Sequence, residues 1–299
     1  MVRQEPAKLP FPSSNLGATS NLKFSVLYLV STPIGNLADL TYRAVEVLSR
    51  CDYILCEDTR HSRVLLDHYA VNTPLKAFHR FNESRSSDAI IADLKEGKSI
   101  ALISDAGTPL LADPGQDIVQ RCRQEGIAVT AIPGACAVIN AWVLSGFAEA
   151  PFQFIGFLPK KETELKTVLA HALFYPGTTI AYESPHRIVE TLEMINRLSP
   201  ERQLCIAREL TKLHEECVIG TAKELLLRVQ ARGEMVLLIS PPQQNISFSN
   251  LSLTELVEML QNDLHLSKSE AIKMAAQLRD LPKREVYKLF LSEDLRNNE

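Results

Sequence analysis

Between residues 26 and 146, two patterns of apolar and polar residues alternate along the chain, one typical of strands and one typical of helices. Short continuous apolar runs such as VLYLV at 26–30 are typical of buried strands, and each is followed by apolar residues at helical spacing. Strands are expected at 26–30, 53–57, 75–79, 99–104 and 128–133, and helices at 39–51 (with Thr41 as N-cap), 62–70, 87–97, 116–126 and 136–146. Because strands and helices alternate and the strands are apolar throughout, we predict a mainly parallel sheet with helices on both faces.

The pattern changes after residue 151, where strands show more alternation and sometimes follow one another directly. Strands are expected at 152–158, 178–183, 203–211, 215–220 and 234–240, with helices in 159–173, 186–198 and 222–231. The two strands on either side of KLHE predict a hairpin, and therefore a mixed sheet. Residues 253–291 read as three helices, with Ser267 or Ser269 as an N-cap.

These patterns predict an α/β fold with two α/β domains and a small C-terminal helical segment. The length of 299 residues suits about two domains. We expect a flexible N-terminal extension at 1–24, an N-terminal α/β domain at 25–149, a second α/β domain at 150–242, and a linker with the helical segment at 243–299.

Composition narrows the function classes. A net charge of −4 argues against a protein that coats nucleic acid by charge alone, although a local basic patch would still hold RNA. No apolar run is long enough to span a membrane, and the N-terminus lacks the apolar core of a signal peptide. The six cysteines form no C-x-x-C pair and the seven histidines no metal-ligand spacing. We therefore expect a cytoplasmic protein with reduced thiols and no metal.

The segment SDAGTPLLADPG at 104–115 follows a buried strand and holds two glycines and two prolines. Such a loop lets the main chain approach a ligand closely, because glycine permits positive φ and proline fixes the path. Four other strand exits are polar or rich in glycine and proline: STPIGNLADLT, EDTRHSR, HRFNESR and IPGACA. Since the exits of parallel strands meet at one edge of the sheet, their convergence predicts a ligand cleft.

Neither a P-loop nor a G-x-G-x-x-G fingerprint occurs in the chain. Loops rich in glycine and proline without a conspicuous lysine or arginine favour a ligand that is not strongly anionic. An adenosine that carries an amino-acid tail and a sulfonium fits this description.

Six segments, TPIGNLADLT, EDTR, SDAGTPLLADPG, IPGACA, YESPHR and RELTKLHEE, carry a resemblance that runs from about Leu27 to Pro241. In this order and spacing they resemble the tetrapyrrole methylase superfamily of S-adenosylmethionine enzymes and, within it, the bacterial cytidine 2′-O-methyltransferases of 16S rRNA. The resemblance implies two α/β domains with the cofactor between them, a homodimer, and methylation of a cytidine ribose in the small ribosomal subunit.

The resemblance also implies which residues bind the cofactor. Related methylases have a Gly-Gly-Asp-Pro turn where this chain has DAGTP, so Thr108 replaces the turn's aspartate and Asp105 is displaced by three positions. Segments YESPHR and GEMV are expected to close over the adenine. The residues carried over are Pro33, Gly35, Asp105, Ala106, Gly107, Thr108, Leu111, Cys136, Ala137, Tyr182 and Glu183.

Methyl transfer to a ribose hydroxyl needs alignment, exclusion of water and the removal of one proton. The candidate catalytic residues are Lys212, Asp58 and His79, and the sequence does not choose among them. Asp58 equally suits a simple pair with Arg60, and the RELTKLHEE segment equally suits a solvated hairpin. Neighbouring glutamates would hold Lys212 protonated, which favours stabilisation of the developing alkoxide over a role as base. The residues expected to contact the RNA substrate are Arg60, Asn82, Arg85, Glu209 and His214.

The C-terminal helices leave two interpretations open. Basic residues at Lys268, Lys273, Lys283, Arg284 and Lys288 would reach phosphates, whereas the acids between them suit a solvated bundle. Two other functions also remain open for the whole chain: a small-molecule tetrapyrrole methylase, and a non-catalytic ribosome-binding protein with the same fold.

Overall fold

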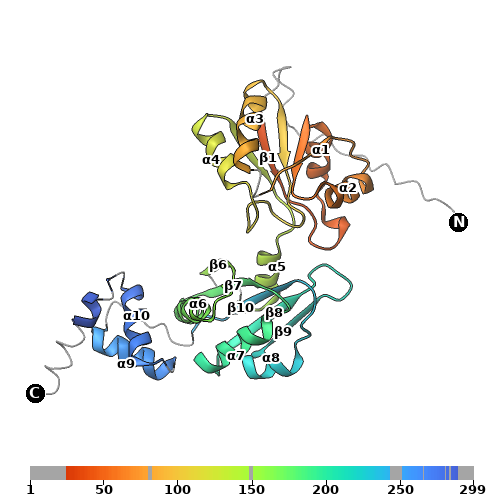
Figure 1. Cartoon of the computed structure of the whole chain (residues 1–299). Coiled ribbons are helices and arrows are strands. Elements are labelled where there is room, and N and C mark those ends of the chain that lie inside the picture. The colour runs from red at the N-terminus through yellow and green to blue at the C-terminus, as the bar shows by residue number, and fades with distance from the viewer. Residues whose placement is uncertain are drawn as a thin grey trace, which may run out of the picture.

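The computed structural model describes residues 25–79, 83–147, 151–242, 251–264, 266–279, 281–282 and 284–288 (Figure 1). The N-terminal extension expected at 1–24 lies outside the described residues. The predicted domain boundary between 149 and 150 lies outside them too.

The first domain is built on a parallel sheet of five strands in the order β3-β2-β4-β1-β5. Its strands are β1 Val26–Val30, β2 Tyr53–Cys56, β3 Leu75–Ala77, β4 Ser99–Leu102 and β5 Ala128–Ile132. Its helices are η1 Leu37–Asp39, α1 Tyr42–Arg50, α2 Thr59–His68, α3 Glu83–Lys95, α4 Gln116–Gln124 and α5 Ala137–Leu144. β1 pairs with β4 and β5, so the exits of β1 and β4 are neighbours.

Helices cover both faces of this sheet, as the apolar strand pattern predicts. Leu48 of α1 and Leu66 of α2 are fully buried in one core cluster, and Leu94 of α3 and Ile118 of α4 in the cluster of the other face. Thr41 caps α1, since its hydroxyl accepts a hydrogen bond from the Ala44 amide at 3.1 Å. The two edge strands differ from the expectation: β3 and β5 carry exposed residues, because a strand at a sheet edge has a neighbour on one side only.

The second domain has a mixed sheet of five strands in the order β6-β7-β10-β8-β9. Its strands are β6 Phe152–Phe157, β7 Thr178–Glu183, β8 Gln203–Arg208, β9 Glu216–Thr221 and β10 Met235–Ile239. Its helices are α6 Glu162–Phe174, α7 Ile188–Leu198 and α8 Ala222–Arg228. β6 and β7 pair in parallel, and the other pairs are antiparallel. The mixed sheet and the β8–β9 hairpin predicted from sequence are therefore confirmed.

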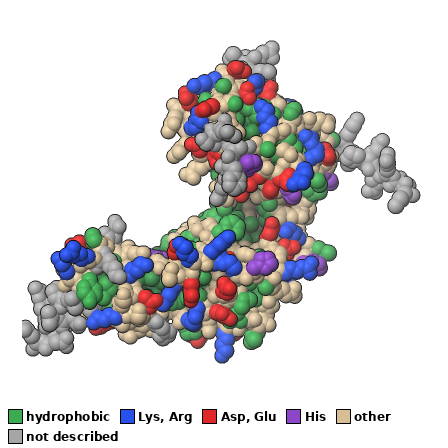
Figure 2. All heavy atoms as spheres, in the orientation of Figure 1, with side chains coloured by type: hydrophobic (Ala, Val, Ile, Leu, Met, Phe, Trp, Pro, Cys, Tyr) green, Lys and Arg blue, Asp and Glu red, His purple; other side chains and the backbone are tan. Residues whose placement is uncertain are grey.

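The two domains meet through α5, which lies between the sheets in Figure 1. Val138 and Ala141 of this helix form one buried cluster with Ala207 and Val236 of the second sheet and Ile34 of the β1 exit. Figure 2 shows hydrophobic side chains gathered at the narrow waist between the domains. Burial of this apolar surface fixes the β-strand exits of the first domain against the second sheet.

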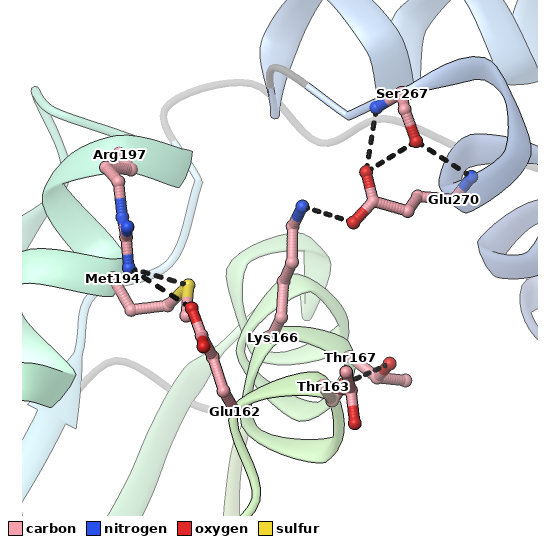
Figure 3. Close-up of polar contacts among 8 residues, drawn as sticks. All are labelled: Glu162, Thr163, Lys166, Thr167, Met194, Arg197, Ser267 and Glu270. Atoms are coloured by element: carbon pink, nitrogen blue, oxygen red, sulfur yellow. Dashed lines mark hydrogen bonds and ion pairs between the residues drawn. The ribbon is translucent and has the colours of Figure 1, made fainter.

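Two C-terminal helices, α9 Leu253–Asp263 and α10 Lys268–Leu278, lie beside α6, and residues 284–288 are also helical. Their apolar side chains belong to the same buried cluster as those of α6 and α7. Ser267 is the N-cap of α10 and forms a capping box with Glu270. Figure 3 shows Lys166 of α6 pointing toward Glu270, with Nζ 2.6 Å from Oε1. The predicted helical segment is therefore packed onto the second domain.

The basic residues of this segment are placed as follows. Lys268, Lys273, Arg284 and Lys288 are exposed. Lys283 lies outside the described residues. No helix in the described ranges is long and apolar enough to cross a membrane.

Candidate active site

A cavity of about 470 Å³ lies between the two domains, at the strand exits of the first sheet. This volume falls within the range of about 300–1,000 Å³ that is typical of small-molecule sites. The lining residues of the first domain are Ile34, Glu57, Asp105, Ala106, Gly107, Thr108, Leu111, Ala112, Asp113, Cys136 and Ala137. Those of the second are Phe157, Tyr182, Glu183, Ser184, Pro185, Ala207, Leu210, Gly233, Glu234, Met235 and Val236.

The loop after β4 lines the cavity with its main chain, and Gly107 shows why it is irregular. Gly107 has φ +79, a conformation that side chains with a Cβ rarely adopt. Its carbonyl accepts from the Thr32 amide at 2.9 Å and its amide donates to the Thr32 carbonyl at 3.1 Å. Thr108 continues the connection, with its hydroxyl 3.1 Å from both Ser31 Oγ and the Ala135 carbonyl. The exits of β1, β4 and β5 are therefore joined into one surface.

The exit of β7 forms the opposite wall through a buried carboxylate. Glu183 accepts hydrogen bonds from the Ser184 amide at 2.7 Å and the Thr191 hydroxyl at 2.6 Å, and Arg187 Nη1 lies at 3.4 Å. Arg187 also donates to the Leu158 carbonyl. These donors occupy the oxygens of Glu183. The carboxylate therefore holds the residues of this wall in a fixed orientation.

Tyr182, also at the β7 exit, contributes an aromatic side chain to the cavity. Burial raises the pKa of its phenol, so the group stays neutral. Its ring lies 5.2 Å from that of Phe157, centroid to centroid. The two rings give this side of the cavity an apolar surface suited to a planar ligand group.

The charged residues of the lining are all acidic: Glu57, Asp105, Asp113, Glu183 and Glu234. Lysine and arginine are absent from the lining, among the residues that the structure describes. Such a cavity attracts a cation more strongly than an anion. The described part of the chain also holds no cluster of three or more His, Cys, Asp or Glu side chains that could hold a metal ion.

Lys212 lies in the β8–β9 hairpin beside the cavity and carries a charge. Its Nζ lies 3.0 Å from Glu209 Oε1 and 2.9 Å from Glu234 Oε2. Partial burial lowers its pKa, but the hydrogen bonds and charges of Glu234 and Glu209 outweigh that effect, and the net pKa is raised. The hydrogen bond from Lys212 in turn lowers the pKa of Glu209. Lys212 is therefore an ammonium ion at neutral pH.

Gly35, expected at the cofactor, lies against this hairpin. A Cβ at Gly35 would overlap Lys212 Cγ and would stand 2.9 Å from Thr211 Oγ1. Pro33 and Gly35 are not among the lining residues, whereas Ile34 between them is. All the other residues expected at the cofactor line the cavity.

The remaining candidates lie outside the lining. Asp58 caps α2 and bonds Arg60, whose hydrogen bonds lower the pKa of Asp58. The Asp58 amide lies 3.4 Å from Asp105 Oδ1, which places the EDTR segment next to the cavity. Arg60 and His214 are exposed, and His79 follows β3 at the sheet edge. Asn82 and the side chain of Arg85 lie outside the described residues.

Some lining residues carry no sequence signal. Ala207 and Leu210 are ordinary apolar residues in and after a strand, and only the packing of α5 against the second sheet turns them toward the cavity. Phe157, at the end of β6, was missed for the same reason, whereas Asp113 lies inside the quoted SDAGTPLLADPG segment, which could have identified it. Glu57 sits inside the quoted EDTR segment, and its position directly after β2 could have identified it.

Solved structures share this fold. The chain is similar to cobalt precorrin-4 methyltransferase, a cobalamin biosynthetic enzyme, with a TM-score of 0.56 and 17% identity over 75% of this chain and 98% of the other. It is also similar to uroporphyrin-III-C-methyltransferase from Thermus thermophilus, with a TM-score of 0.50 and 20% identity over 72% of this chain and 94% of the other. The fold of this chain is thus the one seen in these two structures.

A family model described as Tetrapyrrole (Corrin/Porphyrin) Methylases matches residues 26–226, and the chain belongs to this family. Relatives named ribosomal RNA small subunit methyltransferase I are similar over most of its length. The relative from Haemophilus influenzae is 42% identical over 89% of this chain and 96% of its own length. The one from Bacillus subtilis is 40% identical over 89% of this chain and 94% of its own. The predicted family and the predicted enzyme class, a methyltransferase, are confirmed.

Proposed function

We propose that this enzyme transfers a methyl group from S-adenosylmethionine to the ribose 2′-hydroxyl of a cytidine in 16S rRNA of the small ribosomal subunit. The similarity to the named ribosomal RNA methyltransferases over about nine-tenths of the chain carries this proposal. The family of this chain is one of methylases, which agrees with the proposed methyl transfer. The acidic lining of the cavity agrees with a positively charged methyl donor.

The cavity fits the proposed methyl donor. The main chain of the loop at 105–108 lines the cavity closely enough to contact an adenosine, and Tyr182 and Phe157 offer aromatic surface for its base. The acidic lining complements a sulfonium and an α-amino group. S-adenosylmethionine, when bound, supplies an electrophilic methyl group. We propose that S-adenosylmethionine is held by those predicted residues that line the cavity. They are Asp105, Ala106, Gly107, Thr108, Leu111, Cys136, Ala137, Tyr182 and Glu183.

The chain's own residues would align the acceptor and handle its proton. The Lys212 ammonium stands at the edge of the cavity and would stabilise the negative charge that develops on the ribose oxygen. We retain Asp58 and His79 as the candidates for the base. Arg60, which bonds Asp58, and Glu209, which bonds Lys212, are proposed to contact the RNA, together with Asn82, Arg85 and His214.

We also propose that the enzyme acts in the cytoplasm as a homodimer and recognises the assembled subunit better than free RNA. The apolar side chains of Ile139, Val143 and Leu144 are exposed on α5, which suits a second copy as partner. A net charge of −4 makes recognition of shape and context more effective than attraction to a bare strand. The domain limits predicted from sequence are kept as part of this proposal.

Transfer of tritiated methyl to small subunits tests the function, with subunits taken from a strain that lacks the gene. We expect label in one cytidine as the 2′-O-methyl nucleoside, and much slower transfer to free 16S rRNA. Label in a base, or no transfer with tight cofactor binding, would overturn the assignment. The second result would favour a ribosome-binding protein, and transfer to a tetrapyrrole would favour the small-molecule alternative.

A further inference from the structure

The tip of the β8–β9 hairpin, residues 211–215, carries an apolar side chain that the described protein leaves in solvent. Leu213 is 93% exposed, the largest exposure among the large hydrophobic residues of the described chain. It stands between Lys212 and the exposed His214. A single exposed leucine is ordinary on a protein surface, so its meaning depends on how the tip is held and where it lies.

The tip is held rigidly. The Lys212 amide donates to the Glu209 carbonyl at 3.0 Å and the Glu215 amide to the Lys212 carbonyl at 3.1 Å. The Glu215 carboxylate accepts from the Thr211 amide at 2.6 Å. Glu209 and Thr211 have positive φ values of 50 and 66, a conformation that costs energy in residues other than glycine. The hydrogen bonds and the unfavourable backbone conformations together fix the direction in which Leu213 points.

The tip also lies at the mouth of the cavity. Leu210, three residues before Leu213, lines the cavity, and Lys212 is bonded to Glu234 of the lining. On the other side, Lys212 packs against Gly35 of the β1 exit. Leu213 therefore directly follows Lys212, a residue that is bonded to the lining of the cavity.

We infer that Leu213 is an apolar wedge that packs against a base next to the target ribose in the RNA substrate. This inference rests on the proposed function. The 2′-hydroxyls of a stacked RNA strand are open to its minor groove, but a ribose that enters a cavity between two domains must protrude from the stack, and leucine is one of the apolar residues that proteins insert between bases. His214, exposed and next to the leucine, supplies a donor for a neighbouring phosphate, while Lys212 stays with the ribose oxygen. The wedge replaces the lost stacking on one base and so holds the ribose at the cavity.

The test compares four full-length proteins acting on small subunits from a strain that lacks the gene: wild type, Leu213→Ala, Leu213→Met and Leu227→Ala. Leu227 is the matched control, since it is 85% exposed and lies on α8, which packs on α7 and β9. We expect Leu213→Ala to lower kcat/KM about 10- to 100-fold, the size expected when one leucine side chain is no longer buried against a base. Leu213→Met should recover most of this loss, and Leu227→Ala should match wild type. Cofactor affinity and sedimentation should stay unchanged in all four.

Three results would overturn the wedge. Equal kcat/KM for Leu213→Ala and wild type would show that Leu213 does not contact the substrate. An equal loss in Leu227→Ala would show a general surface effect, and a changed oligomeric state in Leu213→Ala would assign the leucine to a contact between copies. If wild type itself transfers no methyl to the subunits, the proposed function fails and the wedge with it.

Discussion

Gly35 of the first domain lies directly beneath the side chain of Lys212 from the second, with no room for a methyl group between them. The resemblance implies that Gly35 binds the cofactor, and in the structure its lack of a side chain also lets the two domains approach. Gly35 has no positive φ, so alanine meets no backbone penalty there.

The first prediction is that Gly35→Ala lowers turnover about 10- to 100-fold, because the added Cβ displaces Lys212 from Glu209 and Glu234. Cofactor affinity should change little, since neither residue lines the cavity. The check is a double-mutant cycle with Lys212→Ala. If the Gly35 effect acts through Lys212, the double variant will be no slower than Lys212→Ala, and additive losses would contradict this reading.

The second prediction concerns the charge of Lys212. Its raised pKa keeps it protonated at neutral pH, so we expect it to act as a cation. Lys212→Ala should lower single-turnover methylation about 10²- to 10³-fold with nearly unchanged cofactor affinity. Lys212→Arg, which keeps the charge, should retain more activity than Lys212→Ala. A wild-type rate in Lys212→Ala would make the lysine only a salt-bridge partner and leave Asp58 or His79 as the next candidates.

The third prediction is that Gly107→Val abolishes S-adenosylmethionine binding, because the side chain enters the cavity beside Ile34. Valine also suffers at φ +79, so a folding control is needed. Gly126→Val is that control, since Gly126 has φ +69 and no heavy atom within 4 Å of its added Cβ. In calorimetry, the control should bind the cofactor as wild type does. Wild-type affinity in a folded Gly107→Val protein would refute the main-chain cradle.

The fourth prediction concerns the attachment of the C-terminal helices. The ion pair with Lys166, followed by the Ser267 hydrogen bonds, lowers the pKa of Glu270 from 4.5 to about 2. Because the folded-state pKa is depressed, Glu270 stabilises the folded state above pH 4.5, and this contribution is lost as the pH falls toward 2. Since both side chains are partly exposed, we expect Glu270→Gln to cost about 1 kcal/mol at neutral pH.

Urea unfolding at several pH values measures that difference. The difference in unfolding free energy between wild type and Glu270→Gln should narrow as the pH falls from 4.5 to about 2. A gap independent of pH would mean that the Glu270 charge contributes nothing to the attachment.

The sequence predicted the fold well because its signals are local. Apolar runs, helical spacing and N-caps such as Thr41 and Ser267 depend on neighbours in the chain, and the structure has them where they were expected. Helices α2 and α3 begin three or more residues earlier than predicted: Asp58 caps α2 ahead of its first apolar residue. At the start of α2, the cap formed by Asp58 sets the first residue of the helix, and the first apolar residue does not.

The candidate site was predictable only in part, because a cleft between domains depends on distant packing. The loop around Gly107 can be identified from the sequence by its glycines and prolines. Ala207 and Leu210 do not, since their exposure to the cavity follows from the docking of α5. Gly35 shows the converse: the motif was visible, but its contact with Lys212 required both domains to be in place.

The reciprocal hydrogen bonds between Thr32 and Gly107 have a kinetic consequence. They tie the β1 and β4 exits together through the protein's own main chain, so this part of the cavity is already shaped before any ligand arrives. The methyl donor can therefore bind on this side of the cavity without first ordering a loop. Cofactor association should follow a single exponential whose rate constant grows linearly with concentration, without the plateau that a preceding rearrangement would impose.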